Sequence, residues 1–146
     1  MTKSDWAMEM VAGTEVPELV PEPLTLDDYL AYQDVCNNRH PVHYDTEYTQ
    51  AVGLPGPFAP GMLTAGILAN YVANAFGVHS VRRFQVQFRD RSFIGDVLTY
   101  RAKIASMLIR DGEQVAELEL FVTRQTGTTH IQGSATVVLP DPRGGV

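Results

Sequence analysis

The sequence contains few of several residue types, and each shortage narrows the class of protein that it can encode. Its 146 residues include one cysteine, Cys36. One cysteine excludes an internal disulfide and a multi-cysteine metal site, so we expect a reducing compartment and a cytoplasmic location. Basic residues are also few, because 11 Lys and Arg against 17 Asp and Glu leave a net charge of −6. This charge disfavours nucleic-acid binding, which depends on cationic side chains.

A long internal stretch has no charged side chain. No Asp, Glu, Lys or Arg occurs between Glu47 and Arg82. The part of it that can be helical, residues 61–76, would be about 24 Å long, whereas a bilayer core measures about 30 Å. A buried helix is therefore favoured over a membrane span. The N-terminal segment carries acids and prolines where a secretory signal would be apolar, so it is expected to be a mature start.

The length predicts one domain over residues 1–146, with residues 1–12 and 141–146 loosely ordered. Residues 1–24 are expected to be an extended lead-in, with Val16, Leu19 and Val20 along the core. Thr25 followed by Asp28 is typical of a helix start, and that helix should end near residues 37–38. Asp45 is expected to cap a second short helix that ends at Gly53.

The second half of the chain changes from helical to alternating periodicity. Residues 61–76 are apolar on nearly every side, so that helix must be wrapped by other structure. From residue 80 onward, Phe84, Val86 and Phe88 alternate with polar residues, and Asp111-Gly112 is a strong hairpin signal. The pattern predicts an antiparallel meander of four strands. An α+β protein follows, in which a curved sheet encloses one apolar helix.

One segment combines the residues that carry chemistry. The sequence N-R-H-P-V-H-Y-D occupies residues 38–45, and Gly61 opens the apolar helix after a loop rich in glycine and proline. The first amides of a helix have no internal partner, and glycine lets a ligand oxygen approach them closely. A thioester carbonyl on the Gly61 N–H would be polarised as in an oxyanion hole. His43, whose pKa should lie near neutrality, would then activate a water or move a proton.

These residues resemble the MaoC-like (R)-specific enoyl-CoA hydratases of the hotdog superfamily. That family carries Asp-x-Asn-Pro-x-His-x-Asp and then His-Gly-Met-Leu, which correspond here to residues 38–45 and to P-G-M-L at 60–63. The F-I-G-D at 93–96 is similar to the family's sheet turn. The sequence G-S-A at 133–135, before L-P at 139–140, is similar to its last strand. The resemblance covers roughly residues 10–140 and implies the hotdog fold.

The resemblance implies a role for each site residue. His43 would take the family's catalytic histidine role, and Gly61 its oxyanion amide role. In the family, a histidine and an aspartate hold the water that adds across an enoyl-CoA double bond, without a metal or redox cofactor. Asn38 occupies the aspartate position, and an amide can hydrogen-bond water but cannot take its proton. The remaining substrate-site residues are expected to be Phe58 and Met62 beside the acyl chain, with Tyr44 and His40.

Several other side chains are of types that can carry chemistry. Asp34 and Asp45 could supply the missing carboxylate, but we expect Asp34 to face solvent and Asp45 to be a helix cap. His40 and His43 lack the further ligands of a zinc site, so no metal is expected. Cys36 is interpreted as a small buried residue rather than a nucleophile. Four arginines either form a solvated strand face or meet coenzyme A phosphates: Arg82, Arg83, Arg89 and Arg91.

Three functions remain open from the sequence. The first is an enoyl-CoA hydratase or 3-hydroxyacyl-thioester dehydratase, acting alone or as a subunit. The second is a non-catalytic partner subunit that shapes an acyl-CoA pocket, which Asn38 would suit. The third is a hotdog thioesterase. In each case we expect an acyl-CoA ligand and a homodimer, or a heterodimer with another hotdog chain, because an open sheet leaves an exposed edge.

Overall fold

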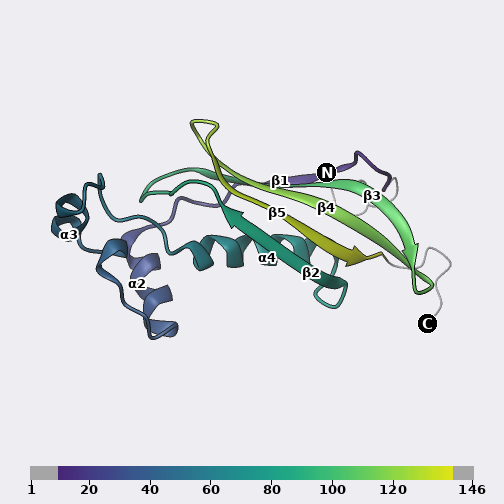
Figure 1. Ribbon diagram of the computed structural model, residues 1–146, viewed down its shortest axis with the longest axis horizontal. Helices are drawn as coiled ribbons and strands as arrows, with labels where there is room; N and C mark the ends of the chain where they lie inside the picture. Colours follow the sequence, from purple (N-terminus) through teal and green to yellow (C-terminus); the bar gives the residue numbers. More distant parts are fainter. Residues whose placement is uncertain (1–9, 140–146) are drawn as a thin grey trace.

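The computed structural model describes residues 10–139, and residues 1–9 and 140–146, which make up most of the two ends expected to be loose, lie outside the described residues. A five-stranded antiparallel sheet packs against one long helix, and two short helices lie together at one end (Figure 1). This is the expected α+β hotdog arrangement. The elements are β1 (Glu15–Leu19), α2 (Leu26–Val35), the 3-10 turn η1 (Pro41–His43), α3 (Thr46–Ala51), α4 (Gly61–Phe76), β2 (Val81–Phe88), β3 (Leu98–Arg110), β4 (Glu113–Arg124) and β5 (Thr129–Val138).

The strand order differs from the expected meander. The order in the sheet is β1-β3-β4-β5-β2, so β2 pairs with β5 at one edge instead of with β3. The lead-in supplies a fifth strand, β1, which pairs with β3 at the other edge. Alternating periodicity identifies strands but not their neighbours, and β1 is too short to show it. Pro17 lies in this edge strand, where a missing N–H is tolerated.

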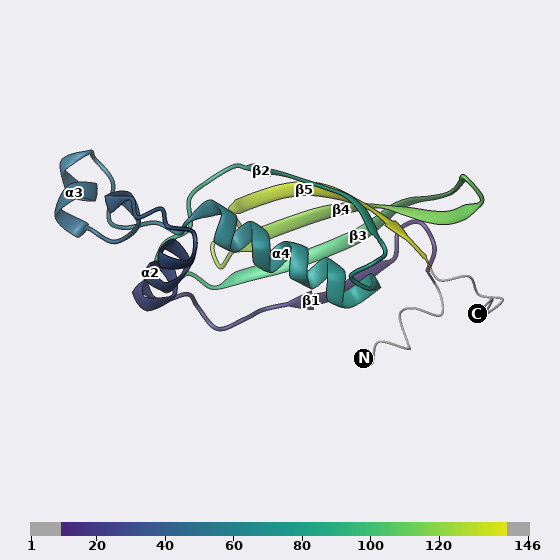
Figure 2. The same ribbon diagram turned by 90° about the horizontal axis from the view of Figure 1, so that it is seen from below.

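Helix α4 lies across one face of the sheet (Figure 2). Its buried side chains, which include Leu68 and Val72, join a core built mainly from β3, β4 and β5. The opposite face of the helix is solvent-exposed, with Met62, Asn70 and Asn74 on it. The sheet therefore covers one side of α4, whereas the apolar pattern predicted cover on every side. No helix in residues 10–139 is long and apolar enough to cross a bilayer.

The lead-in contributes less to the core than expected. Val16 is buried against the sheet, but Leu19 and Val20 are 37% and 49% exposed. The register between β1 and β3 shifts between Val16 and Leu19, so the alternation of faces is lost after Val16. The expectation that all three residues lie along the core was therefore wrong for Leu19 and Val20.

The short helices begin as the sequence predicts. Thr25 and Asp28 form a reciprocal capping box at the start of α2, with the Thr25 N–H donating to Asp28 Oδ2 at 2.7 Å. Asp45 Oδ1 accepts from the Tyr48 N–H at 2.9 Å and so caps α3. Gly53 follows α3 with a φ of 82°, which glycine adopts without strain. These caps place the loop of residues 36–45 between α2 and α3.

Candidate active site

A small pocket lies where the end of α2, the η1 turn and the first turn of α4 meet. Its volume is about 180 Å³. The structure brings Asn38, His43, Gly61 and Met62 together here, although they come from separate segments. The other lining residues are Tyr32, Gln33, Cys36 and Pro60.

His43 is held in one orientation by a backbone carbonyl. Its Nδ1 lies 2.8 Å from the Phe58 carbonyl oxygen, which can only accept a hydrogen bond. In the neutral ring Nδ1 therefore carries the proton, and Nε2 keeps a lone pair. The Phe58 ring packs edge-on against the imidazole, with centroids 5.0 Å apart. Burial is the largest influence on the pKa of His43 and lowers it below 6.5, so the ring is neutral at pH 7.

Gly61 begins α4 without a side-chain cap. Pro60 occupies the N-cap position and offers no capping hydrogen bond, so the first amides of the helix remain available to a ligand. The Leu63 N–H already donates to the Pro60 carbonyl at 3.0 Å. A Cβ at position 61 would lie 3.0 Å from the Phe88 ring. Glycine is thus suited to this position because a side chain there would meet the Phe88 ring, and its N–H is one of the uncapped amides of α4.

Asn38 reaches the pocket because α2 ends in a left-handed residue. Asn37 has a φ of 49°, a conformation that asparagine tolerates better than most residues. The Asn38 N–H then donates to the Gln33 carbonyl at 3.0 Å. Asn38 is exposed in the single chain. The turn therefore presents an amide, not a carboxylate, to the pocket.

No carboxylate lines this pocket among the described residues. Asp34 forms an exposed ion pair with Arg39, and the hydrogen bond from Arg39 lowers the pKa of the Asp34 carboxyl. Asp45 is occupied as the cap of α3. Both expectations for these two side chains are confirmed.

Of the four residues expected to contact the substrate, Met62 alone is among the residues that line the pocket. Met62 lines the pocket and is 62% exposed. Phe58 stands behind His43 and contributes its ring and carbonyl to it. His40 is the N-cap of η1 and Tyr44 its C-cap, and neither is among the pocket-lining residues. His40 Nδ1 accepts from the Val42 N–H at 3.3 Å, so this ring helps to shape the turn.

Two pocket residues were missed or misjudged from the sequence. Gln33 is fully buried, and its Oε1 accepts from the His40 N–H at 2.8 Å, which anchors the loop that carries His43 to α2. Its spacing from buried Tyr29, one helical turn earlier, was the available signal. Cys36 was expected to be buried, but it is exposed and lines the pocket. Because it follows directly after α2, no helical face covers its thiol.

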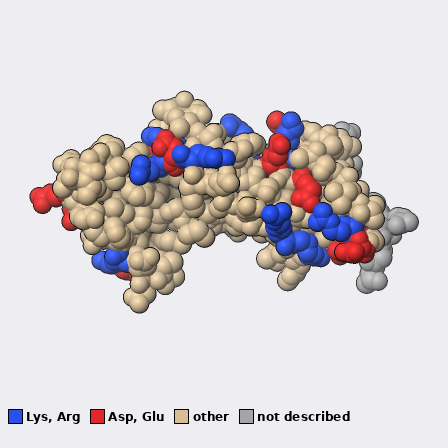
Figure 3. Space-filling model, in the orientation of Figure 1, with Lys and Arg blue, Asp and Glu red and all other residues tan. Residues whose placement is uncertain are grey.

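The four arginines of the β2 region fall into different surroundings. Arg82 pairs with Glu113 at 3.4 Å, Arg83 donates to Gln85, and Arg89 donates to Gln132. Arg91 lies over the Phe58 ring at 5.2 Å. On the face shown in Figure 3, basic and acidic side chains are interspersed and form no continuous basic surface.

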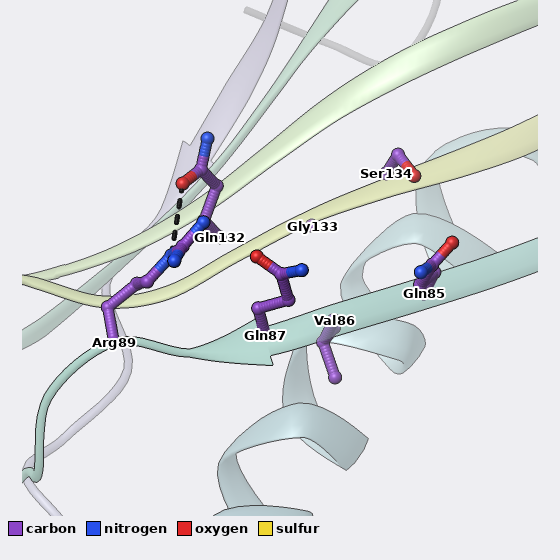
Figure 4. Close-up of a pocket in the computed structure, with 7 residues that line it drawn as sticks. All are labelled: Gln85, Val86, Gln87, Arg89, Gln132, Gly133 and Ser134. Carbon is purple, nitrogen blue, oxygen red and sulfur yellow. Dashed lines mark hydrogen bonds between the residues drawn. The ribbon is translucent and has the colours of Figure 1, made fainter.

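Larger hollows lie away from His43. One, of about 210 Å³, crosses β2 and β5, where Gln85, Gln87 and Arg89 line it and Val86 points towards α4 (Figure 4). Another, of about 420 Å³, lies between β1 and β3 beside the Glu18–Arg101 ion pair. Within residues 10–139, no three His, Cys, Asp or Glu side chains gather as a metal site would require.

A curved antiparallel sheet packed on one helix defines a hotdog-fold protein, and here His43 and the first residue of that helix, Gly61, line one pocket. The chain belongs to the MaoC-like dehydratase family, because the family profile described as "MaoC like domain" matches residues 9–126.

Comparison with known proteins supports this assignment. The chain is 26% identical over 114 residues to the mitochondrial 3-hydroxyacyl-acyl-carrier-protein dehydratase FERN of Solanum lycopersicum, covering 78% of this chain and 69% of that protein. Its fold is similar to that of the (R)-hydratase from A. caviae involved in PHA biosynthesis, with a TM-score of 0.76, 19% identity and coverage of 90% and 98%. It is also similar to a chain of the ChsH1–ChsH2 complex from Mycobacterium tuberculosis, with a TM-score of 0.75, 16% identity and coverage of 91% and 100%.

Proposed function

We propose that the chain is a hydratase or dehydratase of acyl thioesters, which interconverts a 2-enoyl thioester and a 3-hydroxyacyl thioester. The observation that carries the proposal is that His43 and the uncapped amide of Gly61 line one pocket. The first supplies a base at neutral pH, and the second a hydrogen-bond donor for a carbonyl oxygen. Family membership and the named activity of the tomato relative support the same reaction.

In hydration, the thioester carbonyl would accept a hydrogen bond from the Gly61 N–H, which draws electron density from the β-carbon. His43 Nε2 takes a proton from water as the water oxygen bonds to the β-carbon. The same proton then passes from His43 to the α-carbon as the enolate returns to the thioester. Dehydration is the reverse. Hydration is redox-neutral, so we propose that it needs no redox cofactor. We also propose that it needs no metal, because the Gly61 N–H would polarise the carbonyl and His43 would activate the water.

Asn38 decides how much of this chemistry the chain performs by itself. Its amide would orient the water, and His43 would carry both proton transfers. Loss of a general acid or base costs about 100- to 10,000-fold in rate. A second candidate follows from this observation, in which the chain is the pocket-shaping subunit of an unequal pair. The solved ChsH1–ChsH2 complex of a structural relative is an assembly of two differently named chains.

We propose coenzyme A as the carrier and a dimer as the working form, either of two copies or with another hotdog chain. The alternative carrier is a protein, since the tomato relative is named for acyl carrier protein. We propose a cytoplasmic location because the chain has a single cysteine, as reducing compartments favour. Cell fractionation tests this, and recovery of the chain in mitochondria would contradict it.

The deciding experiment measures hydration of 2-enoyl-CoA by the purified chain, first alone and then mixed with a MaoC-like chain that retains the aspartate. Activity of the chain alone supports the first candidate, and activity only in the mixture supports the second. Release of free thiol from acyl-CoA in either assay would instead identify a thioesterase.

Binding can be tested without turnover because Cys36 is the only cysteine and lines the pocket. A saturated acyl-CoA should slow modification of Cys36 by a thiol reagent, whereas ADP, which resembles the nucleotide part of coenzyme A but has no thiol, should protect less. Equal modification rates with and without acyl-CoA would contradict a thioester site at this pocket.

A further inference from the structure

A second histidine lies buried behind the pocket and takes no part in the proposed reaction. His130, near the start of β5, is 2% exposed, and the Thr64 and Ser92 side chains beside it are 0% and 1% exposed. A titratable ring in such surroundings requires hydrogen-bond partners, because burying an unpaired polar group is costly. The hydrogen-bond partners of the His130 ring determine which of its nitrogens carries the proton.

The two ring nitrogens of His130 face different kinds of atom. Nδ1 lies 2.7 Å from the Asp90 carbonyl oxygen, so Nδ1 carries the proton. Nε2 lies 2.9 Å from Thr64 Oγ1 and 3.5 Å from Ser92 Oγ. In the neutral ring Nε2 is an acceptor, and the nearer hydroxyl, that of Thr64, is the donor best placed to reach it.

Thr64 connects this ring to the first turn of α4. Its Oγ1 also lies 2.9 Å from the Gly61 carbonyl oxygen. That carbonyl belongs to the peptide that carries the Met62 N–H, the second uncapped amide of the helix. The single hydroxyl proton of Thr64 is therefore shared between His130 Nε2 and the peptide that follows the proposed oxyanion donor.

The other side of His130 leads to His43 through a series of four hydrogen bonds, two between backbone groups and two between a histidine ring and a backbone carbonyl. The His130 carbonyl accepts from the Arg89 N–H at 2.9 Å, and the ring holds Asp90. Two residues further on, the Ser92 carbonyl accepts from the Ala59 N–H at 2.8 Å. Ala59 follows Phe58, whose carbonyl orients His43. Segment 89–92 thus carries the loop that fixes the catalytic ring.

We propose that His130 is a positioning residue that aligns the two halves of the site: the first turn of α4 through Thr64, and His43 through segment 89–92. The expected effect of His130 on the reaction rate rests on the proposed function. The effect of His130 on the orientation of His43 does not depend on that function. The imidazole of His43 is held by Phe58 and not by α4. A residue that contacts both halves would therefore fix the position of His43 relative to the first turn of α4.

The charge state of His130 is part of this arrangement. The charged groups that face it are Asp90, Asp96 and Arg124, and burial, the largest influence, lowers the pKa of His130. The ring is then neutral at pH 7 and accepts from Thr64. Protonation would make Nε2 a donor, and the Thr64 proton would be left to the Gly61 carbonyl alone.

A matched pair of variants tests the connection to α4. Thr64→Val removes the hydroxyl while keeping the shape, and it should lower kcat by about tenfold to a hundredfold, since small misplacements of reacting groups have costs of this order. KM should change far less, because the pocket walls remain. Thr64→Ser restores the hydroxyl and should recover most of kcat. A Thr64→Val enzyme with unchanged kcat, or a Thr64→Ser enzyme as impaired as Thr64→Val, would overturn this connection.

A measurement without substrate tests the connection to His43, so failure of the proposed function would not obscure it. Nitrogen NMR of the imidazole rings at pH 7 should show His43 and His130 protonated at Nδ1. His130→Asn keeps a donor towards the Asp90 carbonyl and should leave His43 in that tautomer, whereas His130→Leu should mix in the Nε2–H form of His43. If His130→Leu folds and the His43 tautomer is unchanged, the proposal is overturned. If His130→Leu does not fold, a changed His43 tautomer in His130→Asn overturns the proposal.

Discussion

At the scale of single residues, the site depends on which nitrogen of His43 carries a proton. The Phe58 carbonyl assigns the proton to Nδ1, and burial keeps the ring neutral, so Nε2 retains the lone pair that the proposed base requires. His43→Ala should lower kcat on 2-enoyl-CoA by about 100- to 10,000-fold. His79→Ala is a matched control, because His79 is exposed beyond the opposite end of α4 and should retain full activity. Retained turnover in His43→Ala would remove His43 from the mechanism.

The protonation state of His43 also predicts a pH dependence. Because burial lowers the pKa of His43 below 6.5, the neutral ring predominates at pH 7 and is lost as the pH falls through that lowered value. The acidic limb of kcat/KM should therefore lie below pH 6.5. Stability should fall over the same range, since the unfolded chain binds protons more readily than folded His43 and His130. Unfolding must be followed at each pH, so that loss of folded protein is not mistaken for titration of His43. An acidic limb of kcat/KM above pH 6.5 would contradict the assignment of His43 as the base.

Asn38 supports the most informative single substitution. Asn38→Asp places a carboxylate in the pocket without changing the size of the side chain. If the site lacks only this group, the hydration rate should rise by about 100-fold or more, the size of effect expected of a general acid or base. Asn37→Asp adds the same charge one residue away from the pocket lining and should have little effect. No gain in Asn38→Asp would indicate that the pocket serves another use.

At the scale of elements, β2 and β5 approach each other closely at Gly133. A Cβ at Gly133 would lie 2.4 Å from the Gln85 carbonyl oxygen, a backbone atom that cannot rotate away. Gly133→Ala should therefore separate the two strands and lower the free energy of unfolding by about 1–3 kcal/mol. Denaturant titration measures this.

Gly66→Ala is the control for this substitution. Gly66 lies on the exposed face of α4, and a Cβ added there would have no neighbouring atom within 4 Å. Alanine there should raise stability by about 0.5–1 kcal/mol, because glycine weakens a helix interior. Equal effects of the two substitutions would mean that the close approach of β2 and β5 is unimportant.

At the scale of the whole molecule, the sheet ends in two short or exposed edges, β1 and β2. Unpaired strand edges favour association, and the exposed face of α4 lies beside the β2 edge (Figure 2). We therefore predict that the 16.1 kDa chain is a dimer in solution. Sedimentation analysis of the chain alone, and of the chain mixed with an aspartate-bearing MaoC-like chain, checks this. A chain that is monomeric in both samples would contradict the prediction.

The sequence determined the local structure and the family. Thr25 and Asp45 each set a helix boundary through hydrogen bonds to neighbours a few residues away, and such short-range effects can be predicted from local patterns. The spacing of His43 and Gly61 likewise indicated a shared site, and the structure places both in one pocket.

Only the tertiary structure decided the strand order, the exposure of Cys36 and the position of His130. The strand order and the position of His130 depend on contacts between segments far apart in the chain, as when β5 brings His130 against Thr64, 66 residues earlier. Periodicity cannot specify such pairs, because it records which face of an element is apolar but not what lies against that face. The sequence therefore determined the groups that form the pocket, and the packing of distant strands decided what holds them in place.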